Sequence, residues 1–341
     1  MKTYNVLELT GDGISGELVR SVHAVAAVLP FETKFESVDL SLPHREKVGM
    51  KVYDEVMEKI GDLRVAMKYP TATEGESPNR VLRDRCDFQV IHRPVMTFDG
   101  IKTNFKQRLD IDVVRVATGG TYMDRGRRIG SESAVSLRVI ERGPSTHAAE
   151  FAFKLASTLG CNVVSTSKYT IQKEADGLFE ECVQGIADRH PEIEYRRELF
   201  DALLGGLILN PERYRVVVCP NEYGDFLSDM ACGLIGSIGL GDSAAYSFDK
   251  EGEVQVAMFD PSGGSAPDIA GKGICNPAAA LLAFSSLLRH VGELSAAKVL
   301  RQSIKQCIAD GRKTRDIGGQ LDTVEFTQAV CEQFTSELAT A

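Results

Sequence analysis

The strongest constraint on the fold is an alternation of short β-branched runs with longer amphipathic stretches. In the first part of the chain this pattern predicts strands over residues 4–9, 35–40 and 63–67, and helices that begin at Ser15, Lys51 and Pro78. A second series has strands expected over residues 113–116, 162–166 and 215–219, and helices over residues 147–157 and from Glu174 and Gly224. This order is typical of βαβ units, so we expect an α/β fold built on a parallel sheet, with a largely helical C-terminal third.

Length, charge and cysteine usage narrow the class of protein. A chain of 341 residues is long enough for two domains. Its net charge of −9, without a basic block, gives no electrostatic reason to expect nucleic acid or an anionic membrane as a partner. The eight cysteines form no CxxC pair, and no apolar run approaches the ~18 residues of a membrane span. We therefore expect a cytoplasmic protein with reduced thiols and no export signal or membrane anchor.

A glycine-rich segment follows the first predicted strand. Residues 11–16 match GxGxxG, the fingerprint of dinucleotide-binding turns. The ribose-binding acid expected about 20 residues later would be Glu32 or Glu36, but Pro30 interrupts the chain before either. A tight turn whose glycines adopt positive φ explains the same residues and is the interpretation that the sequence favours.

Arginines and a helix start indicate an anion site. With Ser77 as N-cap, Asn79 and Arg83 would lie one turn apart on one helix face, near backbone N–H groups that favour an anion. Arg93 follows shortly, and Arg115 ends an apolar strand, where an unpaired cation is costly. Together they predict a clamp for carboxylates, whereas Arg83 and Arg93 alone would also fit a solvated surface.

Two further segments carry polar groups in functional patterns. Asp225 and Asp229 are four residues apart, so a helix would project both carboxylates from one face, as a hard divalent cation such as Mg²⁺ or Mn²⁺ requires. Two acids on a solvated helix face are the alternative. Residues 263–277 form a loop rich in glycine, and a loop of this length favours ligand contact over mere connection.

Taken in order, seven segments of the chain resemble the β-decarboxylating dehydrogenases, the family of isocitrate, isopropylmalate, homoisocitrate and tartrate dehydrogenases. They are GDGI, SPNRVLR with RP after it, DVVRVATGGTY, SKYTIQKEADGLF, FDALL, PNEYGDFLSD and GGSAPDIAGKGICNP. The resemblance implies an isopropylmalate dehydrogenase-like two-domain α/β fold. Its large, cofactor-binding domain would comprise residues 1–95 and 247–341, and its small, dimerisation domain residues 96–246.

The resemblance also implies roles for individual residues. Tyr122 and Lys168 match the catalytic acid and base. The substrate-carboxylate binders would be Ser77, Asn79, Arg83, Arg93 and Arg115. The ligands of Mg²⁺ or Mn²⁺ would be Asp201, Asp225 and Asp229. NAD would be bound by Asn221, Gly264, Ser265, Ala266, Asp268 and Asn276, with Asp268 on the ribose hydroxyls. Family members take Lys168 and Asp201 from the second subunit, so a homodimer with shared active sites is expected.

The function implied is NAD-dependent oxidative decarboxylation of a 3-substituted malate, with isocitrate as the first-choice substrate. Homoisocitrate, phosphonomethylmalate, isopropylmalate and tartrate remain open, as do a non-catalytic regulatory subunit and a plain Rossmann protein. The departures from the family pattern are Gly263 in place of a histidine, Val116 and Ala117 after Arg115, and Thr170 in place of an asparagine.

Overall fold

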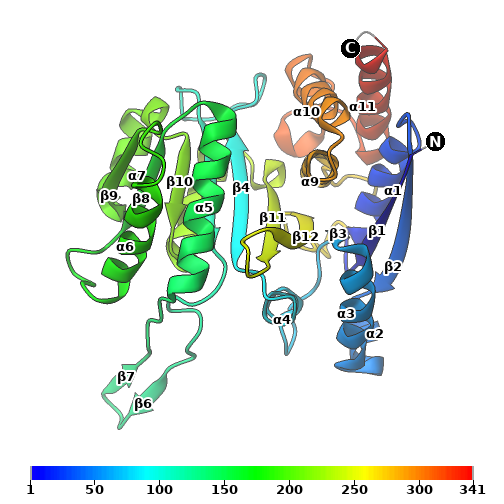
Figure 1. Ribbon diagram of the computed structural model, residues 1–341. Coiled ribbons are helices and arrows are strands. Elements are labelled where there is room, and N and C mark those ends of the chain that lie inside the picture. The colour runs from blue at the N-terminus through cyan, green and yellow to red at the C-terminus, as the bar shows by residue number, and fades with distance from the viewer. Residues whose placement is uncertain (1, 340–341) are drawn as a thin grey trace.

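One continuous ten-stranded sheet runs through the computed structural model, which describes residues 2–339 (Figure 1). Its strand order is β2-β1-β3-β12-β11-β4-β5-β10-β8-β9. The strands of this sheet are β1 (Thr3–Thr10), β2 (Glu32–Asp39), β3 (Val65–Lys68), β4 (Val90–Met96), β5 (Asp110–Val116), β8 (Val163–Ser167), β9 (Tyr195–Leu199), β10 (Val216–Cys219), β11 (Asp242–Phe248) and β12 (Val254–Pro261). A separate hairpin, β6 (Arg127–Ile129) with β7 (Ser133–Val135), projects from the body of the molecule (Figure 1).

Helices occupy the segments between the strands. They are α1 (Ser15–Ala26), α2 (Leu42–Val48), α3 (Lys51–Leu63), α4 (Pro78–Arg85), α5 (Arg142–Leu159), α6 (Ala175–Ala187), α7 (Phe200–Leu209), α8 (Asn221–Leu234), α9 (Ala278–His290), α10 (Leu294–Ala309) and α11 (Thr323–Leu338), with short 3₁₀ turns η1 (Pro211–Arg213), η2 (Ile238–Leu240) and η3 (Arg315–Ile317). The predicted α/β fold is confirmed. Among the described residues, no helix is long and apolar enough to cross a membrane.

The sheet is parallel at both ends and antiparallel in the middle. β1 pairs in parallel with β2 and β3, and β10 pairs in parallel with β5 and β8. β11 is antiparallel to both β12 and β4, and β4 is antiparallel to β5. The parallel pairing expected from the βαβ pattern is therefore present at both ends of the sheet, and the antiparallel centre, where a short turn joins β11 to β12, was not predicted.

Helices cover both faces of the sheet, and β1 is therefore buried on both sides. Val6 packs in a core cluster with Leu18 of α1, whereas Leu7 belongs to a second cluster with Val52 and Val56 of α3. Successive strand residues point to opposite faces, so one buried strand serves two layers.

The two ends of the chain lie together on one side of the molecule, and the middle of the chain lies on the other (Figure 1). The C-terminal α11 packs on α1, where the Thr327 hydroxyl donates a hydrogen bond to Ser21 Oγ at 2.9 Å. The predicted domain boundaries fall inside β4 and β11, so central strands rather than linkers connect the two sides. The division at these residues stays a prediction.

The glycines of residues 11–16 serve the packing of the chain itself. Gly13 has φ +59°, and a Cβ there would lie 1.8 Å from the carbonyl oxygen of Ser265, which accepts a hydrogen bond from Ile14 N–H. A Cβ at Gly11 would lie 2.0 Å from the carbonyl oxygen of Pro70. These contacts fit the tight turn that the sequence favours.

We expect Gly13→Ala to lower the free energy of unfolding by about 1–3 kcal/mol, because alanine at positive φ is strained and its methyl group meets a fixed carbonyl. Urea denaturation without NAD measures this. Gly16→Ala is the matched control, since it lies in α1 with only the tip of the Arg20 side chain near, 3.7 Å away. Equal unfolding midpoints for the two variants would contradict the packing role.

Candidate active site

A cleft of about 720 Å³ lies between α4, α8 and the central strands β4 and β5. The structure brings all five predicted substrate binders to its wall, together with Tyr122, Asn221 and Asp225. The residues that line it include Ser77, Asn79, Arg80, Arg83, Arg93, Arg115, Tyr122, Asn221 and Asp225. Their convergence on one hollow could not be read from their separation in the sequence.

Helix α4 presents its first turn to the cleft. It begins at Pro78, and the Ser77 side chain caps it by accepting a hydrogen bond from the Arg80 N–H at 3.4 Å. The predicted N-cap is confirmed. Proline at the first helical position fixes this start, so Asn79 and Arg83 stand one turn apart above the cleft.

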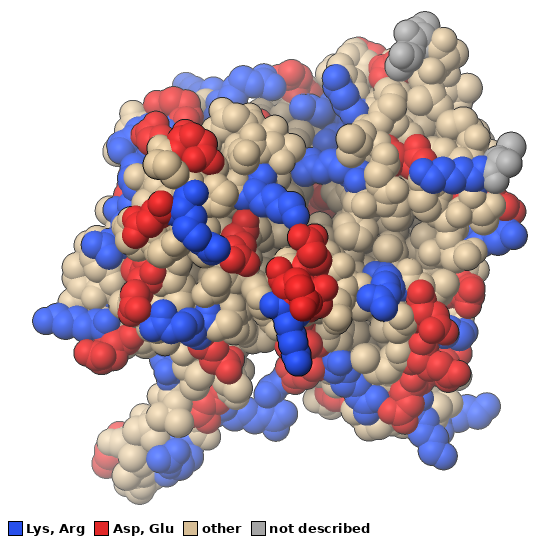
Figure 2. All heavy atoms as spheres, in the orientation of Figure 1, with Lys and Arg blue, Asp and Glu red and all other residues tan. Residues whose placement is uncertain are grey.

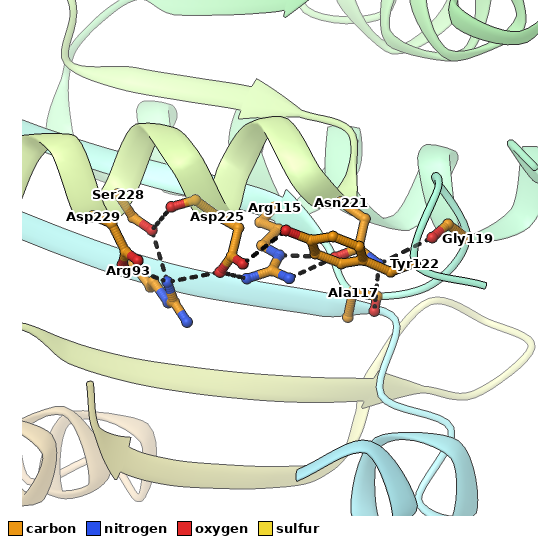
Figure 3. A network of polar contacts seen from close by, with 9 residues as sticks. All are labelled: Arg93, Arg115, Ala117, Gly119, Tyr122, Asn221, Asp225, Ser228 and Asp229. Atoms are coloured by element: carbon orange, nitrogen blue, oxygen red, sulfur yellow. Dashed lines mark hydrogen bonds and ion pairs between the residues drawn. The ribbon is translucent and has the colours of Figure 1, made fainter. Parts of the chain in front are cut away.

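Arg115 is anchored between β5 and the start of α8 (Figure 3). Its Nε and Nη2 donate to Asn221 Oδ1 at 2.9 and 2.7 Å, and its Nη1 forms an ion pair with Asp225. The Asn221 amide donates in turn to the carbonyl oxygens of Ala117 and Gly119. Every hydrogen-bonding position of this buried amide is thus used within the chain. Its geometry is that of a positioning residue, and its predicted contact with a cofactor stays untested.

Arg93 lies between the two carboxylates of α8 (Figure 3). Its Nη1 is 3.3 Å from Asp225 Oδ1, 3.4 Å from Asp229 Oδ1 and 2.8 Å from Ser228 Oγ. Its buried Nε has no partner among the described residues. Both acids lie on α8 and contact the same guanidinium, so the prediction that they share a helix face is confirmed, whereas their role as metal ligands stays a prediction.

Four arginines line the cleft together with four acidic side chains, which are Asp84, Asp87, Glu141 and Asp225. Burial lowers the pKa of Arg115 to about 10, and the neighbouring charges of Arg93 and Arg83 act in the same direction. Burial and Arg93 also lower the pKa of Arg83, for which the described residues supply no hydrogen bond or ion pair. A guanidinium without a partner and a spare Nε donor on Arg93 are groups that a bound carboxylate can satisfy.

Tyr122 reaches the same carboxylate from a glycine turn after β5. Gly119 and Gly120 have φ +68° and +66°, which a side chain would strain. The turn brings the Tyr122 hydroxyl to 3.2 Å from Asp225 Oδ2, to which it donates. Burial and the Asp225 charge raise the pKa of Tyr122 above its usual value, so the hydroxyl keeps its proton.

Lys168 and Asp201 are paired outside the lining of this cleft. Strands β8 and β9 run in parallel, with Ser167 opposite Leu199, so the residues that follow both strands meet at one edge. Lys168 Nζ is 2.7 Å from Asp201 Oδ1, and this contact lowers the pKa of Asp201. Within one chain, the predicted base and this predicted metal ligand therefore lie together, and neither is among the residues that line the cleft.

The carboxylates fit a divalent cation only in part. Among the described residues, no group of three or more histidine, cysteine, aspartate or glutamate side chains converges as a metal site. Asp225 and Asp229 supply two oxygen ligands on one helix face. Mg²⁺ is often held by one or two carboxylates plus substrate oxygens and water, so this pair fits such an ion.

The loop that carries the predicted cofactor contacts is fixed from one side. Glu17 of α1 accepts hydrogen bonds from Gly271 N–H at 3.0 Å and Gly273 N–H at 2.8 Å. Asp268 is exposed, and Ala266 has φ +39°, which is rare outside glycine. Asn276 donates to Asp316 at 3.0 Å. Gly264 and Ser265 directly precede Ala266. A Cβ atom at Gly263 would have no other atom within 4 Å.

Sequence reasoning missed a buried charge network behind the site. Arg138 donates to Asp176 Oδ1 at 2.9 and 2.7 Å and also pairs with Glu222, next to Asn221. The second oxygen of Asp176 accepts a hydrogen bond from the Lys168 backbone N–H at 2.7 Å. Arg138 thus ties the start of α8 to the segment of the predicted base. Nothing in its local sequence indicates this role.

Gly224 sets how closely α8 approaches β5. A Cβ at this position would lie 2.6 Å from Cβ and 2.7 Å from Cγ of Arg115. We expect Gly224→Ala to lower the free energy of unfolding by about 1–3 kcal/mol, because the Arg115 stem cannot yield without losing its partners. Gly233→Ala on the same helix is the control, as no atom lies within 4 Å of its Cβ. Urea unfolding measures the stability of both variants, and equal stabilities would contradict a close approach of α8 to β5 at Gly224.

Comparisons with known proteins extend this picture. The profile of the family described as isocitrate/isopropylmalate dehydrogenase matches residues 5–337. The mitochondrial isocitrate dehydrogenase [NAD] catalytic subunit 5 of Arabidopsis thaliana is 35% identical, over 94% of this chain and 86% of the relative. The 3-isopropylmalate dehydrogenase of Archaeoglobus fulgidus (strain ATCC 49558 / DSM 4304 / JCM 9628 / NBRC 100126 / VC-16) is 34% identical, over 95% and 98%.

A solved structure agrees with the sequence matches. The crystal structure of isocitrate dehydrogenase from Methylococcus capsulatus superposes with a TM-score of 0.88 at 30% identity, covering 97% of this chain and 99% of that one. The resemblance carried by the seven segments is therefore confirmed, and the chain belongs to the isocitrate/isopropylmalate dehydrogenase family of oxidoreductases.

Proposed function

We propose that this protein catalyses the NAD-dependent and divalent-metal-dependent oxidative decarboxylation of a 3-substituted malate, with isocitrate as the first-choice substrate. The observation that carries the proposal is the convergence of Arg83, Arg93 and Arg115 on one cleft beside the Asp225 carboxylate. The guanidinium groups of Arg83 and Arg93 keep donors that can bind substrate carboxylates, whereas all three nitrogen atoms of Arg115 already have partners.

The side chains of the cleft have different proposed roles in substrate binding. Arg83 and the free Nε of Arg93 are placed to bind substrate carboxylates, while Asn221 holds Arg115 in a fixed orientation. Ser77 and Asn79 at the start of α4 are polar and favour a polar substituent over an isopropyl group. This is why isocitrate precedes isopropylmalate among the candidate substrates.

Asp225 and Asp229 would hold a divalent cation, and Asp201 would complete its ligands from a second chain. When bound, such a cation supplies positive charge that lowers the pKa of the substrate hydroxyl and stabilises the enolate left by loss of CO₂. Lys168 would accept the hydroxyl proton, and NAD would accept the hydride. Tyr122, whose raised pKa keeps its hydroxyl protonated, would return a proton to the enolate carbon.

The position of Lys168 supports a homodimer. Its Nζ pairs with Asp201 rather than with a residue of the cleft, so in this proposal the base would act on the substrate of a second copy. Exposed apolar side chains on α7 and α8 support such an interface, with Leu209 70% and Phe226 55% exposed. An obligate contact of this kind needs an apolar patch.

NAD rather than NADP is the proposed cofactor because Asp268 is exposed on the glycine-rich loop. A carboxylate there accepts hydrogen bonds from two ribose hydroxyls and repels a 2′-phosphate. Gly263 leaves open the space in which the family pattern has a histidine, so adenine stacking would have to come from another residue. The eight cysteines are free, which supports a reducing compartment such as the cytoplasm.

The deciding experiment measures nicotinamide reduction and CO₂ release by the purified protein with NAD or NADP. The candidate substrates are isocitrate, homoisocitrate, isopropylmalate, tartrate and phosphonomethylmalate, each with Mn²⁺ or with excess EDTA. We expect NADH from isocitrate, loss of activity in EDTA and recovery with Mn²⁺. Turnover with another of these substrates would change only the proposed substituent on the malate and leave the proposed reaction unchanged. Binding of NAD and isocitrate without any turnover would favour a regulatory subunit.

We expect Lys168→Met to lower turnover by about 100-fold or more while NAD affinity stays the same, because the change removes a base and no cofactor contact. Steady-state kinetics and an NAD titration measure the two effects. Lys173→Met, an exposed lysine five residues further along the chain, is the control. Unchanged turnover in Lys168→Met would remove this residue from the mechanism.

A further inference from the structure

A second pocket lies on the opposite face of the strands that carry the cleft arginines. It encloses about 300 Å³ and is lined by β4, β5, α5, the β11–β12 hairpin, α9 and α10. Neighbouring residues of a strand point to opposite faces, so Arg93 lines the cleft while His92 lines this pocket. On β5, Arg115 and Asp112 are divided in the same way. We call this hollow the rear pocket.

Aromatic rings form one wall of the rear pocket. Phe151 of α5 packs on Tyr246 of β11 with 4.9 Å between ring centroids, and His147 stacks on Phe248 at 5.0 Å. The His290 ring lies 6.0 Å from that of Tyr246. Rings gathered around a cavity of this size, with a few charged groups at its edge, are typical of small-molecule sites.

Basic side chains gather at the mouth. Figure 2 shows Lys and Arg side chains at the edge of a hollow between the two sides of the molecule, with Asp and Glu side chains beside them. The basic residues of the lining are Lys154, Arg215, Arg289 and Arg301, against the acidic residues Asp112 and Glu150. Lys154 pairs with Glu253, Arg215 with Asp112 and Asp110, and Arg301 with Asp242, so Arg289 is the basic residue of the lining for which the described residues show no acidic partner.

Both acids already have partners. Asp112 accepts a hydrogen bond from His92 Nε2 at 2.6 Å and pairs with Arg215. Burial raises the pKa of Asp112, but His92 and Arg215 more than offset this and lower it to about 2. Glu150 pairs with Arg189 at 2.8 Å. The carboxylates therefore do not repel an incoming anion with their full charge.

Two guanidinium groups at the mouth keep donors for a ligand. Arg301 uses only its Nη2, on Asp242 at 2.9 Å and on nearby oxygens. The Arg289 guanidinium forms no hydrogen bond or ion pair within residues 2–339, whereas its backbone carbonyl accepts a hydrogen bond from Gly292 N–H at 3.2 Å. As a cation in the last turn of α9, Arg289 also interacts favourably with the helix dipole, but that interaction explains neither the rings nor the cavity.

We propose that the rear pocket binds a small anion that carries an aromatic ring. The ring would pack on Phe151, Tyr246 and Phe248, and a phosphate or carboxylate group would accept hydrogen bonds from Arg289 and Arg301. This site is separate from the cleft and does not depend on the function proposed for it.

Phenyl phosphate is the probe, titrated into the full-length protein and followed by ligand-observed NMR. Inorganic phosphate and phenol, its two halves, are titrated in parallel. We expect phenyl phosphate to bind more tightly than either half, because ring and anion are recognised together. Binding weaker than about 10 mM, or phosphate binding as tightly as phenyl phosphate, would overturn the proposal.

Variants locate the bound probe. Arg289→Glu should weaken phenyl phosphate by about tenfold or more, since it replaces a charged donor with a repelling acid. Lys51→Glu, at an exposed lysine on α3, changes the net charge equally and should leave binding unchanged. Thermal unfolding verifies that both variants fold, and Arg289→Gln repeats the test without the acid. Loss of binding in Arg83→Met but not in Arg289→Glu would place the probe in the cleft and overturn the proposal.

Discussion

Arg115 carries a guanidinium on a buried strand in the middle of the sheet, with 3% of its side chain exposed. A buried charge costs several kcal/mol unless hydrogen bonds and an opposite charge compensate it, so the surroundings of Arg115 are tightly constrained. Asn221 satisfies two of its nitrogen atoms and Asp225 a third. Because both come from the first turns of α8, and because Gly224 between them has no side chain, the helix can lie directly on the arginine.

The geometry around Arg115 makes several donors share one carboxylate. Asp225 contacts Arg93, Arg115 and Tyr122, so its two oxygens are shared among three donors. In the proposed reaction the substrate carboxylates would replace Asp225 and Asp229 as partners of the arginines, and the two aspartates would then be free to bind a cation. The substrate and the cation would then stabilise each other's binding, which is the physical reason to expect that neither binds tightly alone.

Local sequence patterns correctly predicted those features of the fold that depend only on residues close together in the sequence. The N-cap at Ser77, the helix start at Ser15 and the shared face of Asp225 and Asp229 depend on neighbours in sequence, and the structure has each of them. The pairing of Lys168 with Asp201 depends instead on β9, a strand with no buried residue in its middle, which sequence periodicity could not identify. The ion pairs of Arg138 could not be predicted either, because its two acidic partners, Asp176 and Glu222, are distant from it in the sequence.

The sequence predicts the central strand β5, in which valines surround Arg115, but not the central strands β4 and β11. β4 contains His92 and Arg93 side by side, and β11 begins with the buried pair Asp242 and Ser243. These residues break the apolar run by which a buried strand is recognised. Each is nonetheless paired across the fold, as His92 is with Asp112 of β5. A strand in which polar residues interrupt the apolar run on both faces lacks the pattern of a core strand, so periodicity alone does not identify β4 or β11.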